Sequence, residues 1–529
     1  MELNTYLGQK GYTIPKNELT IEQQKQIRND LMIKPFSLRE SSPMSNSEGN
    51  KTFPAYRESS GKFYVPHYYG VENFGAPKQY KISQGNDINL EFAGKLRENQ
   101  EVVVNTYIEH VNNVGFGGGL LELPCAYGKT VLSLNIISHL KKKTFIIVHK
   151  EFLMNQWIER IQQFLPKARV GKIQGPIIDI DDKDIVIGML QSLSMKEYPA
   201  STFESFGLTI IDEVHHISSE VFSNSLFKLV TKYMLGLSAT MNRKDGTTKV
   251  FKMFLGEVIF KGKRDEAREV VVHGIKYEVD DDEFNELKLD YRGNPAYSTM
   301  ISKLCEYNRR TEFILKIITD MLNENPNQQI MILAQYKNIL KYLHDAIAHR
   351  NIATVGYYIG GMKEQALKAT ESKKIVIATY AMAAEALDIK SLTTLIMATP
   401  KTDIEQSVGR ILREKHSSPV VVDIVDSHDL FQNQWRKRKT FYKKENYKII
   451  YTSSTNYTPD TSKWLVVFNP NLTGPKTCAK KCIKKPISEK SNSSTDKSIT
   501  NDSDEEIDEE PEKPKDKYLS GQCFLKFKK

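Results

Sequence analysis

Two adjacent carboxylates follow a short apolar run near the middle of the chain, and two histidines follow shortly after them. The run is Ile210-Ile211, the acidic pair is Asp212-Glu213, and the histidines are His215 and His216. A buried strand that ends in acidic residues can deliver a carboxylate to the edge of a parallel sheet, where α/β proteins bind ligands. Taken alone, a strand followed by a solvated acidic turn explains these residues equally well.

A second stretch, Gly128-Lys129-Thr130, separates a short apolar segment from a helix-forming one. The N-terminus of a helix offers N–H groups and the positive end of its dipole to phosphate. Lys129 can then reach the β- and γ-phosphates, and the Thr130 hydroxyl can ligate Mg²⁺. The strict phosphate-loop pattern would place a glycine where Leu123 stands. We still expect a nucleotide-binding turn made of Pro124, Cys125, Ala126, Tyr127, Gly128, Lys129 and Thr130 rather than an ordinary strand–turn–helix.

With a phosphate-binding turn in the same chain, the acidic pair gains a specific role. Asp212 would hold Mg²⁺ together with Thr130, directly or through water. Glu213 would orient and deprotonate the attacking water, which requires a carboxylate close to the γ-phosphate. His215 would bridge the nucleotide site to a second domain. The pattern therefore predicts hydrolysis of a nucleoside triphosphate with Mg²⁺.

A third group of polar residues lies far downstream and comprises Gln406, Arg410 and Arg413. The two arginines are three apart on a predicted helix and share a face. Guanidinium groups there can reach a γ-phosphate from across a cleft and stabilise the charge that develops on it. The alternative is a solvated basic helix face, which we favour less because Gln406 and Gly409 precede Arg410.

The elements that must position these residues are strands alternating with helices, in two successive regions. The expected strands are 120–123, 145–148, 185–188, 208–211 and 233–240, then 330–333, 354–358, 374–378, 394–397 and 419–423. Alternation of this kind predicts mostly parallel sheets with right-handed crossovers. The fold class is therefore α/β with two tandem domains.

Composition divides the chain further. We expect an N-terminal accessory module (1–87), a first α/β domain (88–261), a charged connector (262–304), a second α/β domain (305–450), an extension (451–485) and a low-complexity charged tail (486–529). The tail composition cannot bury a core and predicts disorder. Aromatic and basic residues alternate over 53–57 and 62–70, which fits a small β-rich module with an aromatic core better than a base-stacking surface.

Bulk composition limits the class of protein. The 529 residues are 40% hydrophobic with a net charge of +9, which allows sizeable cores and favours a polyanionic partner. Five cysteines at this length make a disulfide framework unexpected. No signal peptide or bilayer-spanning run is apparent, so we expect a soluble intracellular protein without a membrane partner.

The set of motifs resembles superfamily 2 helicases. The matching segments lie between about residues 88 and 445 and are Leu96–Gln100, Gly128–Thr130, Asp212–His215, Ser238–Thr240, Thr379–Asp388 and Gln406–Arg413. The Asp-Glu-Val-His-His run and Gly236–Gly246 look like the XPB-type branch. Gly11–Lys16 and Val65–Gly70 look like helicases of large DNA viruses, including the poxvirus transcript-release type.

The resemblance implies two RecA-like domains and further residue roles. Arg97 and Gln100 would contact adenine, Ser238 and Thr240 would couple hydrolysis to movement, and Thr379 with residues 385–388 would link nucleic acid to the nucleotide site. His149-Lys150 and Gln191-Ser192 would touch the nucleic-acid backbone. Family members often have glycine at the positions of Ala126 and Ala386, which raises the alternative of a scaffold that turns over little ATP.

We therefore expect an ATP-dependent helicase or translocase that acts on DNA, double-stranded in the first place, with RNA or a hybrid left open. The expected role is viral transcription, in elongation or transcript release, with RNA polymerase or other transcription factors as partners. Such a protein would act in the host cytoplasm and could be packaged in the virion. A repair- or restriction-type DNA translocase is the alternative. The sequence does not predict the oligomeric state.

Overall fold

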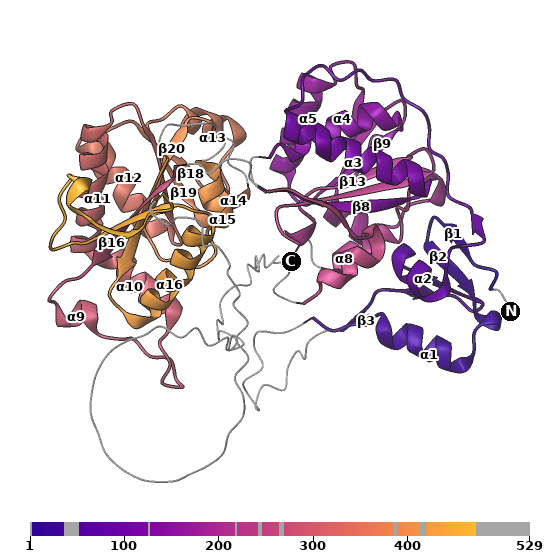
Figure 1. Ribbon diagram of the computed structural model, residues 1–529, viewed down its shortest axis with the longest axis horizontal. Coiled ribbons are helices and arrows are strands. Elements are labelled where there is room, and N and C mark those ends of the chain that lie inside the picture. The colour runs from indigo at the N-terminus through magenta and orange to yellow at the C-terminus, as the bar shows by residue number, and fades with distance from the viewer. Residues whose placement is uncertain are drawn as a thin grey trace, which may run out of the picture.

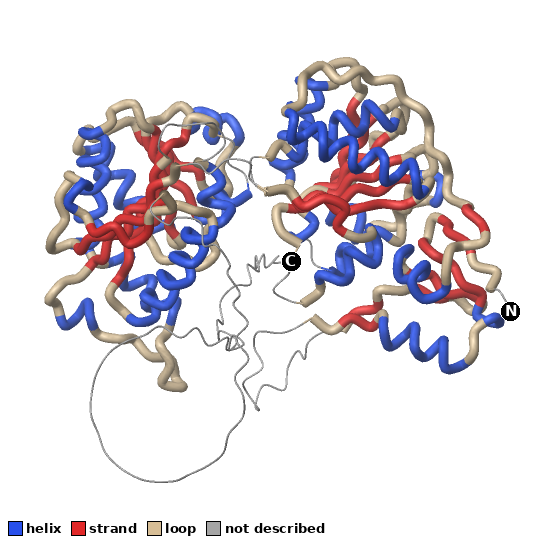
Figure 2. Tube along the Cα trace, in the orientation of Figure 1, coloured by secondary structure: helices blue, strands red, loops and turns tan. Residues whose placement is uncertain are grey.

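The computed structural model describes residues 3–35, 52–124, 127–216, 219–241, 246–263, 269–385, 389–411 and 419–471. They form a small N-terminal module and two larger lobes, each built on its own β-sheet (Figures 1 and 2). Within these ranges, no helix is both long and apolar enough to cross a lipid bilayer. The tail that was expected to be disordered lies outside the described residues.

The N-terminal module is a five-stranded sheet of strand order β5-β6-β2-β1-β7, and Gly70 of helix α2 packs against the Tyr12 ring of β2. Tyr12 and Phe63 are fully buried and Tyr69 is 5% exposed, so these rings form the aromatic core expected from the sequence. Its elements are β1 (Tyr6–Gly8), β2 (Gly11–Pro15), η1 (Lys16–Glu18), α1 (Ile21–Asp30), β3 (Met32–Ile33), β4 (Phe53–Pro54), β5 (Arg57–Glu58), β6 (Lys62–Val65), α2 (His67–Phe74) and β7 (Gln79–Tyr80).

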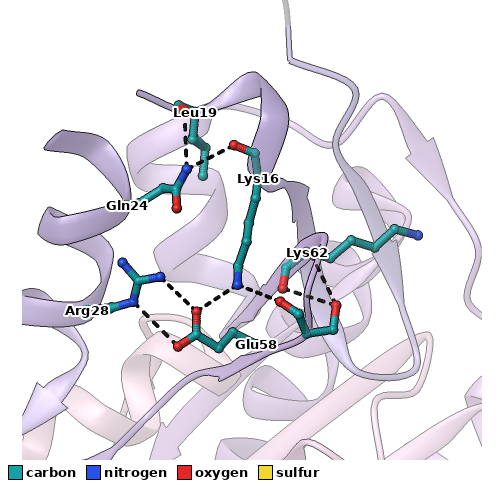
Figure 3. A network of polar contacts seen from close by, with 7 residues as sticks. Lys16, Leu19, Gln24, Arg28, Glu58 and Lys62 are labelled. Atoms are coloured by element: carbon teal, nitrogen blue, oxygen red, sulfur yellow. Dashed lines mark hydrogen bonds and ion pairs between the residues drawn. The ribbon is translucent and has the colours of Figure 1, made fainter. Parts of the chain in front are cut away.

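A polar network joins the start of the module to its fifth strand (Figure 3). Glu58 accepts from Lys16 Nζ and from Arg28 Nη2, each at 2.9 Å. The Gln24 side chain donates to the carbonyl of Lys16 at 3.1 Å. Ion pairs as exposed as these stabilise a fold by roughly 1 kcal/mol or less. The apolar core, rather than this network, therefore holds the module together.

The module is packed onto the first lobe and shares a core with it. Tyr68 of α2 donates to the carbonyl of Gly118 at 2.8 Å and accepts from its N–H at 2.6 Å. A Cβ at Gly256, whose φ is +93°, would lie 2.8 Å from the Tyr68 ring, so glycine is required there. Buried residues of the module and of the lobe belong to one continuous apolar cluster, which includes Leu7, Tyr12, Ile14, Phe63, Val65, Phe222, Leu226, Phe227 and Phe254.

Lobe 1 is an eight-stranded sheet of order β11-β10-β12-β9-β13-β14-β8-β15, parallel except for β11. Alternate residues of each strand pack on opposite faces, as Ile210 and Ile211 do. The strands are β8 (Gly117–Glu122), β9 (Thr144–Val148), β10 (Val170–Gln174), β11 (Ile177–Ile178), β12 (Ile185–Met189), β13 (Leu208–Ile211), β14 (Tyr233–Ser238) and β15 (Val258–Lys261). The helices are α3 (Glu98–Val114), α4 (Lys129–Leu140), α5 (Glu151–Phe164), α6 (Leu190–Met195), η2 (Ala200–Phe203), η3 (Val214–His216), α7 (Ser219–Leu226) and α8 (Thr248–Leu255).

Lobe 2 is also built on an eight-stranded, mostly parallel sheet, with strand order β18-β19-β17-β20-β21-β16-β22-β23. Among the described strands, the edge strand β23 is antiparallel to its neighbour β22. Its strands are β16 (Val271–Tyr277), β17 (Gln329–Ala334), β18 (Val355–Tyr358), β19 (Ile375–Thr379), β20 (Leu392–Met397), β21 (Val420–Asp426), β22 (Lys448–Ser453) and β23 (Leu465–Phe468). Its helices are α9 (Asp282–Asn285), α10 (Tyr297–Glu306), α11 (Asn308–Glu324), α12 (Lys337–His349), α13 (Glu364–Glu371), α14 (Tyr380–Glu385), α15 (Glu405–Arg410), α16 (Asp429–Lys444) and η4 (Thr461–Lys463).

Two boundaries differ from the sequence expectation. Residues 262–304 were expected to be an irregular connector, yet β16 lies inside this range and pairs with β21 on one side and β22 on the other. The extension after residue 450 likewise adds β23 to the same sheet. Lobe 2 therefore begins at the connector and ends beyond the expected boundary, because its sheet takes strands from both flanking segments.

Two buried ion pairs fasten the helices of lobe 2 to its sheet. Arg310 of α11 binds Asp426 through two hydrogen bonds of 2.5 and 2.8 Å, and neither side chain is exposed. Arg438 of α16 binds Asp423 in the same two-pronged way at 2.7 and 2.8 Å. Both acceptors lie on β21, so this strand anchors both α11 and α16.

Candidate functional site

The predicted site residues gather where the parallel strands of lobe 1 end. Strand β8 runs into the turn before Lys129, β13 runs into Asp212, and the neighbouring β14 ends at Ser238. In a parallel sheet these carboxyl ends meet at one edge, which is where ligands bind in α/β folds. The order of strands therefore brings together motifs that are far apart in the sequence.

Lys129 and Glu213 form an ion pair at this edge, with 2.7 Å between Nζ and Oε1. Lys129 is the first residue of α4, and Gly128 before it has a φ of +90°. Glu213 has a φ of +49°, a conformation that is uncommon for a residue with a side chain. Backbone strain of this kind is concentrated at functional sites. The turn after β13 therefore directs the Glu213 carboxylate toward the start of α4.

Asp212 lies beside this pair and is almost completely buried, with 7% of its surface exposed. The indole N–H of Trp157 donates to its Oδ2 at 2.9 Å. Burial, and secondly the charge of Glu213, raise the pKa of the Asp212 carboxyl to about 6, while Lys129 opposes this shift. A buried carboxylate with one oxygen held by a neutral donor is suited to a cation of high charge.

Arg97 and Gln100 close the other side of the turn. Arg97 Nη2 and Gln100 Nε2 both donate to the carbonyl of Tyr127, the latter at 2.8 Å. Glycine is favoured at position 128 because its φ is +90°, a conformation that side chains rarely adopt, and a Cβ there would also lie 2.3 Å from Gln100 Nε2. Contact of Arg97 and Gln100 with adenine stays a prediction. The Tyr127 N–H donates to the carbonyl of Pro124, and Cys125 and Ala126 lie outside the described residues.

His215 connects the acidic pair to lobe 2. Its Nδ1 lies 2.7 Å from Ser238 Oγ and 3.4 Å from Glu213 Oε2. Across the gap between the lobes, Gln406 Nε2 donates to His215 Nε2 at 3.1 Å. With Nε2 accepting this bond, the proton of the neutral ring belongs on Nδ1, where it faces Ser238 and Glu213. One imidazole therefore contacts two motifs of lobe 1 and one of lobe 2.

Of the two predicted arginines, only Arg410 lies within the residues that the structure describes. Arg410 is the last residue of α15, four positions after Gln406, so both lie on the same face of that helix. Because Gln406 contacts His215, this face points toward lobe 1. Arg413 lies outside the described residues.

The residues expected to touch nucleic acid lie on the same edge of lobe 1. His149 and Lys150 follow β9, and Gln191 Nε2 donates to the carbonyl of His149 at 3.0 Å. Ser192 Oγ accepts from the N–H of Gly175 at 2.9 Å. The two expected segments are thus adjacent. Thr379 ends β19 in lobe 2, whereas residues 386–388 lie outside the described part of the chain.

Helix α5 makes further contacts with lobe 2. Asn155 Nδ2 donates to Glu364 Oε2 at 3.2 Å, and Glu159 pairs with Lys368 at 2.7 Å. Phe152 packs against the apolar clusters of both lobes. The two lobes therefore meet at α5 with α13 and at His215 with Gln406.

The residues present fit a magnesium-bound nucleotide. Helix α4 begins at the turn and offers its N–H groups and dipole to phosphate, with Lys129 and Thr130 in its first turn. Asp212 supplies a buried carboxylate beside them. Trp157 could not be predicted as a site residue, because a tryptophan on the apolar face of a helix indicates core packing and nothing more. Only its N–H on Asp212 reveals a second role.

Comparison with known proteins agrees with this arrangement. The family model described as the res subunit of type III restriction enzymes matches residues 93–243, and the helicase conserved C-terminal domain matches residues 312–415. A protein of Acanthamoeba polyphaga mimivirus, named as a candidate ATP-dependent RNA helicase, is 35% identical over 464 residues, covering 84% of this chain and 86% of the relative.

More distant relatives come from other large DNA viruses. A candidate ATP-dependent RNA helicase of African swine fever virus is 27% identical, covering 67% of this chain and 74% of the relative. A candidate helicase of invertebrate iridescent virus 6 is 26% identical, covering 68% of this chain and 85% of the relative. Among solved structures, the Hef helicase domain of Pyrococcus furiosus aligns with a TM-score of 0.43 at 13% identity, over 65% of this chain and 98% of that chain.

The mimivirus relative matches along most of both chains, and the two family models coincide with the two lobes that carry the site. These findings confirm the resemblance drawn from the motifs. The chain belongs to the superfamily 2 helicases of the large DNA viruses, and it is an ATP-dependent helicase enzyme.

Proposed function

We propose that this viral helicase is a DNA translocase whose ATP hydrolysis is stimulated by nucleic acid and serves transcription, in elongation or in release of the transcript. The observation that carries the proposal of a translocating motor is the contact of His215 with Ser238 in lobe 1 and with Gln406 in lobe 2. A single ring that touches both lobes beside Glu213 makes the geometry of hydrolysis depend on lobe closure.

Lobe 1 supplies the groups that bind the Mg²⁺-bound nucleotide and activate the attacking water. Thr130 and Asp212 hold Mg²⁺, which neutralises charge on the phosphates when bound. Lys129 contacts the β- and γ-phosphates, and Glu213 accepts a proton from the attacking water. Residues 124–130 are the proposed phosphate-binding turn, and Arg97 and Gln100 are the proposed adenine contacts.

Lobe 2 supplies the groups that complete the site on closure. Gln406, Arg410 and Arg413 approach the γ-phosphate from α15 and the segment after it. Removing such an arginine finger costs about 10³- to 10⁵-fold in turnover in other NTPases. Alternation between open and closed lobes would then move the two lobes in turn along one strand.

The choice of duplex DNA rests on the XPB-like Asp-Glu-Val-His-His motif and on the net charge of +9, which favours a polyanion. The mimivirus and swine fever virus relatives are named as RNA helicases, so RNA is the competing substrate. Transcription is proposed because the motif set resembles viral transcript-release helicases.

The decisive experiment is steady-state ATPase of the full chain with duplex DNA, single-stranded DNA or RNA at two salt concentrations. We expect duplex DNA to stimulate most, with the stimulation lost at high salt as counterions compete for the backbone. Stimulation by RNA alone would overturn the DNA assignment. Release of nascent RNA from stalled elongation complexes, with Glu213→Gln as the inactive control, tests the transcription role.

One observation favours a second candidate. The family model that matches residues 93–243 is that of a restriction-enzyme subunit, so a repair- or restriction-type duplex translocase is the runner-up. Displacement of a triplex-forming strand without any effect on elongation complexes would favour this candidate. A nucleic-acid scaffold with low turnover, the remaining alternative, predicts no stimulation by any of the three nucleic acids.

A further inference from the structure

Trp157 lies in the middle of α5 with only 1% of its surface exposed, and its indole nitrogen donates to Asp212 Oδ2 at 2.9 Å. The two residues are 55 positions apart in the chain. They meet because α5 follows β9, and β9 is the direct neighbour of β13 in the sheet. The contact is therefore a property of the fold rather than of a local motif.

The chemistry of this hydrogen bond is specific. An indole N–H can only donate and carries no charge, so it orients a carboxylate without neutralising it. A lysine or arginine in the same place would compete with a cation for the carboxylate. Because Oδ2 accepts from the indole, rotation of the Asp212 side chain breaks a hydrogen bond between two buried groups, which costs about 1–3 kcal/mol.

The position of Trp157 on α5 adds a second argument. Phe152, Asn155 and Glu159 of the same helix contact lobe 2, whereas Trp157 faces the core of lobe 1. One side of α5 therefore contacts lobe 2, and on its inward side the Trp157 indole contacts the Asp212 carboxylate. Simple core packing would be satisfied by any large apolar ring and would not require the N–H to meet Asp212.

We propose that Trp157 is a positioning residue for Mg²⁺ binding, because its indole N–H fixes the Asp212 carboxylate in the orientation that receives the ion. This inference rests on the proposed role of Asp212 as a magnesium ligand. Groups that orient a metal ligand from behind commonly change metal affinity by about 10- to 100-fold when removed. Trp157 touches neither the nucleotide nor the reacting atoms and acts only through Asp212.

The test compares Trp157→Phe with the wild-type chain by the Mg²⁺ dependence of nucleotide binding. Fluorescent ADP is titrated into each protein in chelator-buffered Mg²⁺, so the readout does not depend on turnover. We expect Trp157→Phe to raise the Mg²⁺ concentration at half-maximal binding about 10- to 100-fold, while binding without Mg²⁺ stays unchanged. A shift of less than twofold in a folded variant would overturn the inference.

Trp464→Phe is the matched control. Trp464 is 6% exposed in lobe 2, and its indole nitrogen also donates a hydrogen bond, to the carbonyl of Thr458 at 3.1 Å. The control therefore loses the same atoms and the same kind of hydrogen bond away from Asp212, and its Mg²⁺ dependence should not move. An equal shift in Trp464→Phe would show a general effect of lost indoles and overturn the inference.

Two further variants separate the possible failures. If Trp157→Phe does not fold, benzothienylalanine at position 157 keeps the ring size and replaces the N–H by sulfur, and its Mg²⁺ dependence decides. Asp212→Asn tests the proposed function itself. Loss of Mg²⁺-dependent binding in Asp212→Asn with no shift in the Trp157 variants overturns only the positioning role. Intact Mg²⁺ dependence in Asp212→Asn removes Asp212 as the ligand, and the inference falls with it.

Discussion

Glu213→Gln should tighten ATP binding but slow ATP hydrolysis. Glu213 is paired with Lys129, the lysine that the phosphates of ATP also need. Nζ of Lys129 and Oε1 of Glu213 are 2.7 Å apart, and their side chains are only 13% and 23% exposed. Phosphate and Glu213 therefore compete for one ammonium group. Glutamine keeps the size of the side chain but removes its charge, so it weakens the competitor and also removes the proposed base.

The size of each effect follows from the geometry. A hydrogen bond to a charged group is worth about 1.5–3 kcal/mol, and at about 1.4 kcal/mol per factor of ten its weakening should tighten ATP binding by at most about 10- to 150-fold. Loss of the general base should lower turnover by about 10²- to 10⁴-fold. The same substitution should thus lower Kd and lower kcat.

The assay is equilibrium binding of a fluorescent ATP analogue together with steady-state ATPase on saturating nucleic acid. Glu257→Gln is the control, because Glu257 pairs with Lys252 at 2.6 Å in the same lobe but is 79% exposed. Neither Kd nor kcat should change in that variant. Unchanged affinity in Glu213→Gln would refute the competition between phosphate and Glu213, and normal turnover would refute its role as the base.

Two further predictions concern stability. Asp426→Asn leaves the fully buried Arg310 without its counter-charge, so it should lower the free energy of unfolding by about 3–5 kcal/mol. Urea denaturation measures this change. The control is Asp429→Asn at an exposed helix start, which should change the free energy of unfolding by about 1 kcal/mol or less. Burial lowers the pKa of His67 to about 4, so the unfolded chain binds this proton more readily and stability should fall as pH drops from about 6.5 toward 4. Thermal unfolding at several pH values should show a shallower loss in His67→Phe, and an identical pH profile would contradict the assignment.

The strands of both lobes were predictable because a buried parallel strand is a short continuous apolar run. Residues 145–148, 208–211 and 374–378 are such runs, and the structure makes each a strand. Strand β16 was missed because His273 and Lys276 interrupt its apolar pattern inside a charged region. Its neighbours β21 and β22 supply the burial that its own sequence does not reveal.

The candidate site was predictable as a set of motifs but not as a set of contacts. Residue types at Lys129, Asp212 and Glu213 indicate phosphate and metal chemistry by themselves. The partners of these residues depend on strand order, which no local pattern encodes. The Trp157–Asp212 hydrogen bond joins residues 55 positions apart, and the Gln406–His215 hydrogen bond joins residues 191 positions apart. The residue type of a tryptophan or a glutamine does not indicate which distant residue it will contact.

The core that the N-terminal module shares with lobe 1 has a consequence for how the chain folds during synthesis. Leu7, Tyr12 and Phe63 pack in one cluster with Phe222 and Phe254, which a ribosome adds about 200 residues later. The first 80 residues therefore leave the ribosome with an incomplete core and stay exposed to aggregation or chaperone binding until that later segment emerges. Contacts of such large sequence separation also make folding slow. The module and lobe 1 should accordingly fold as one cooperative unit.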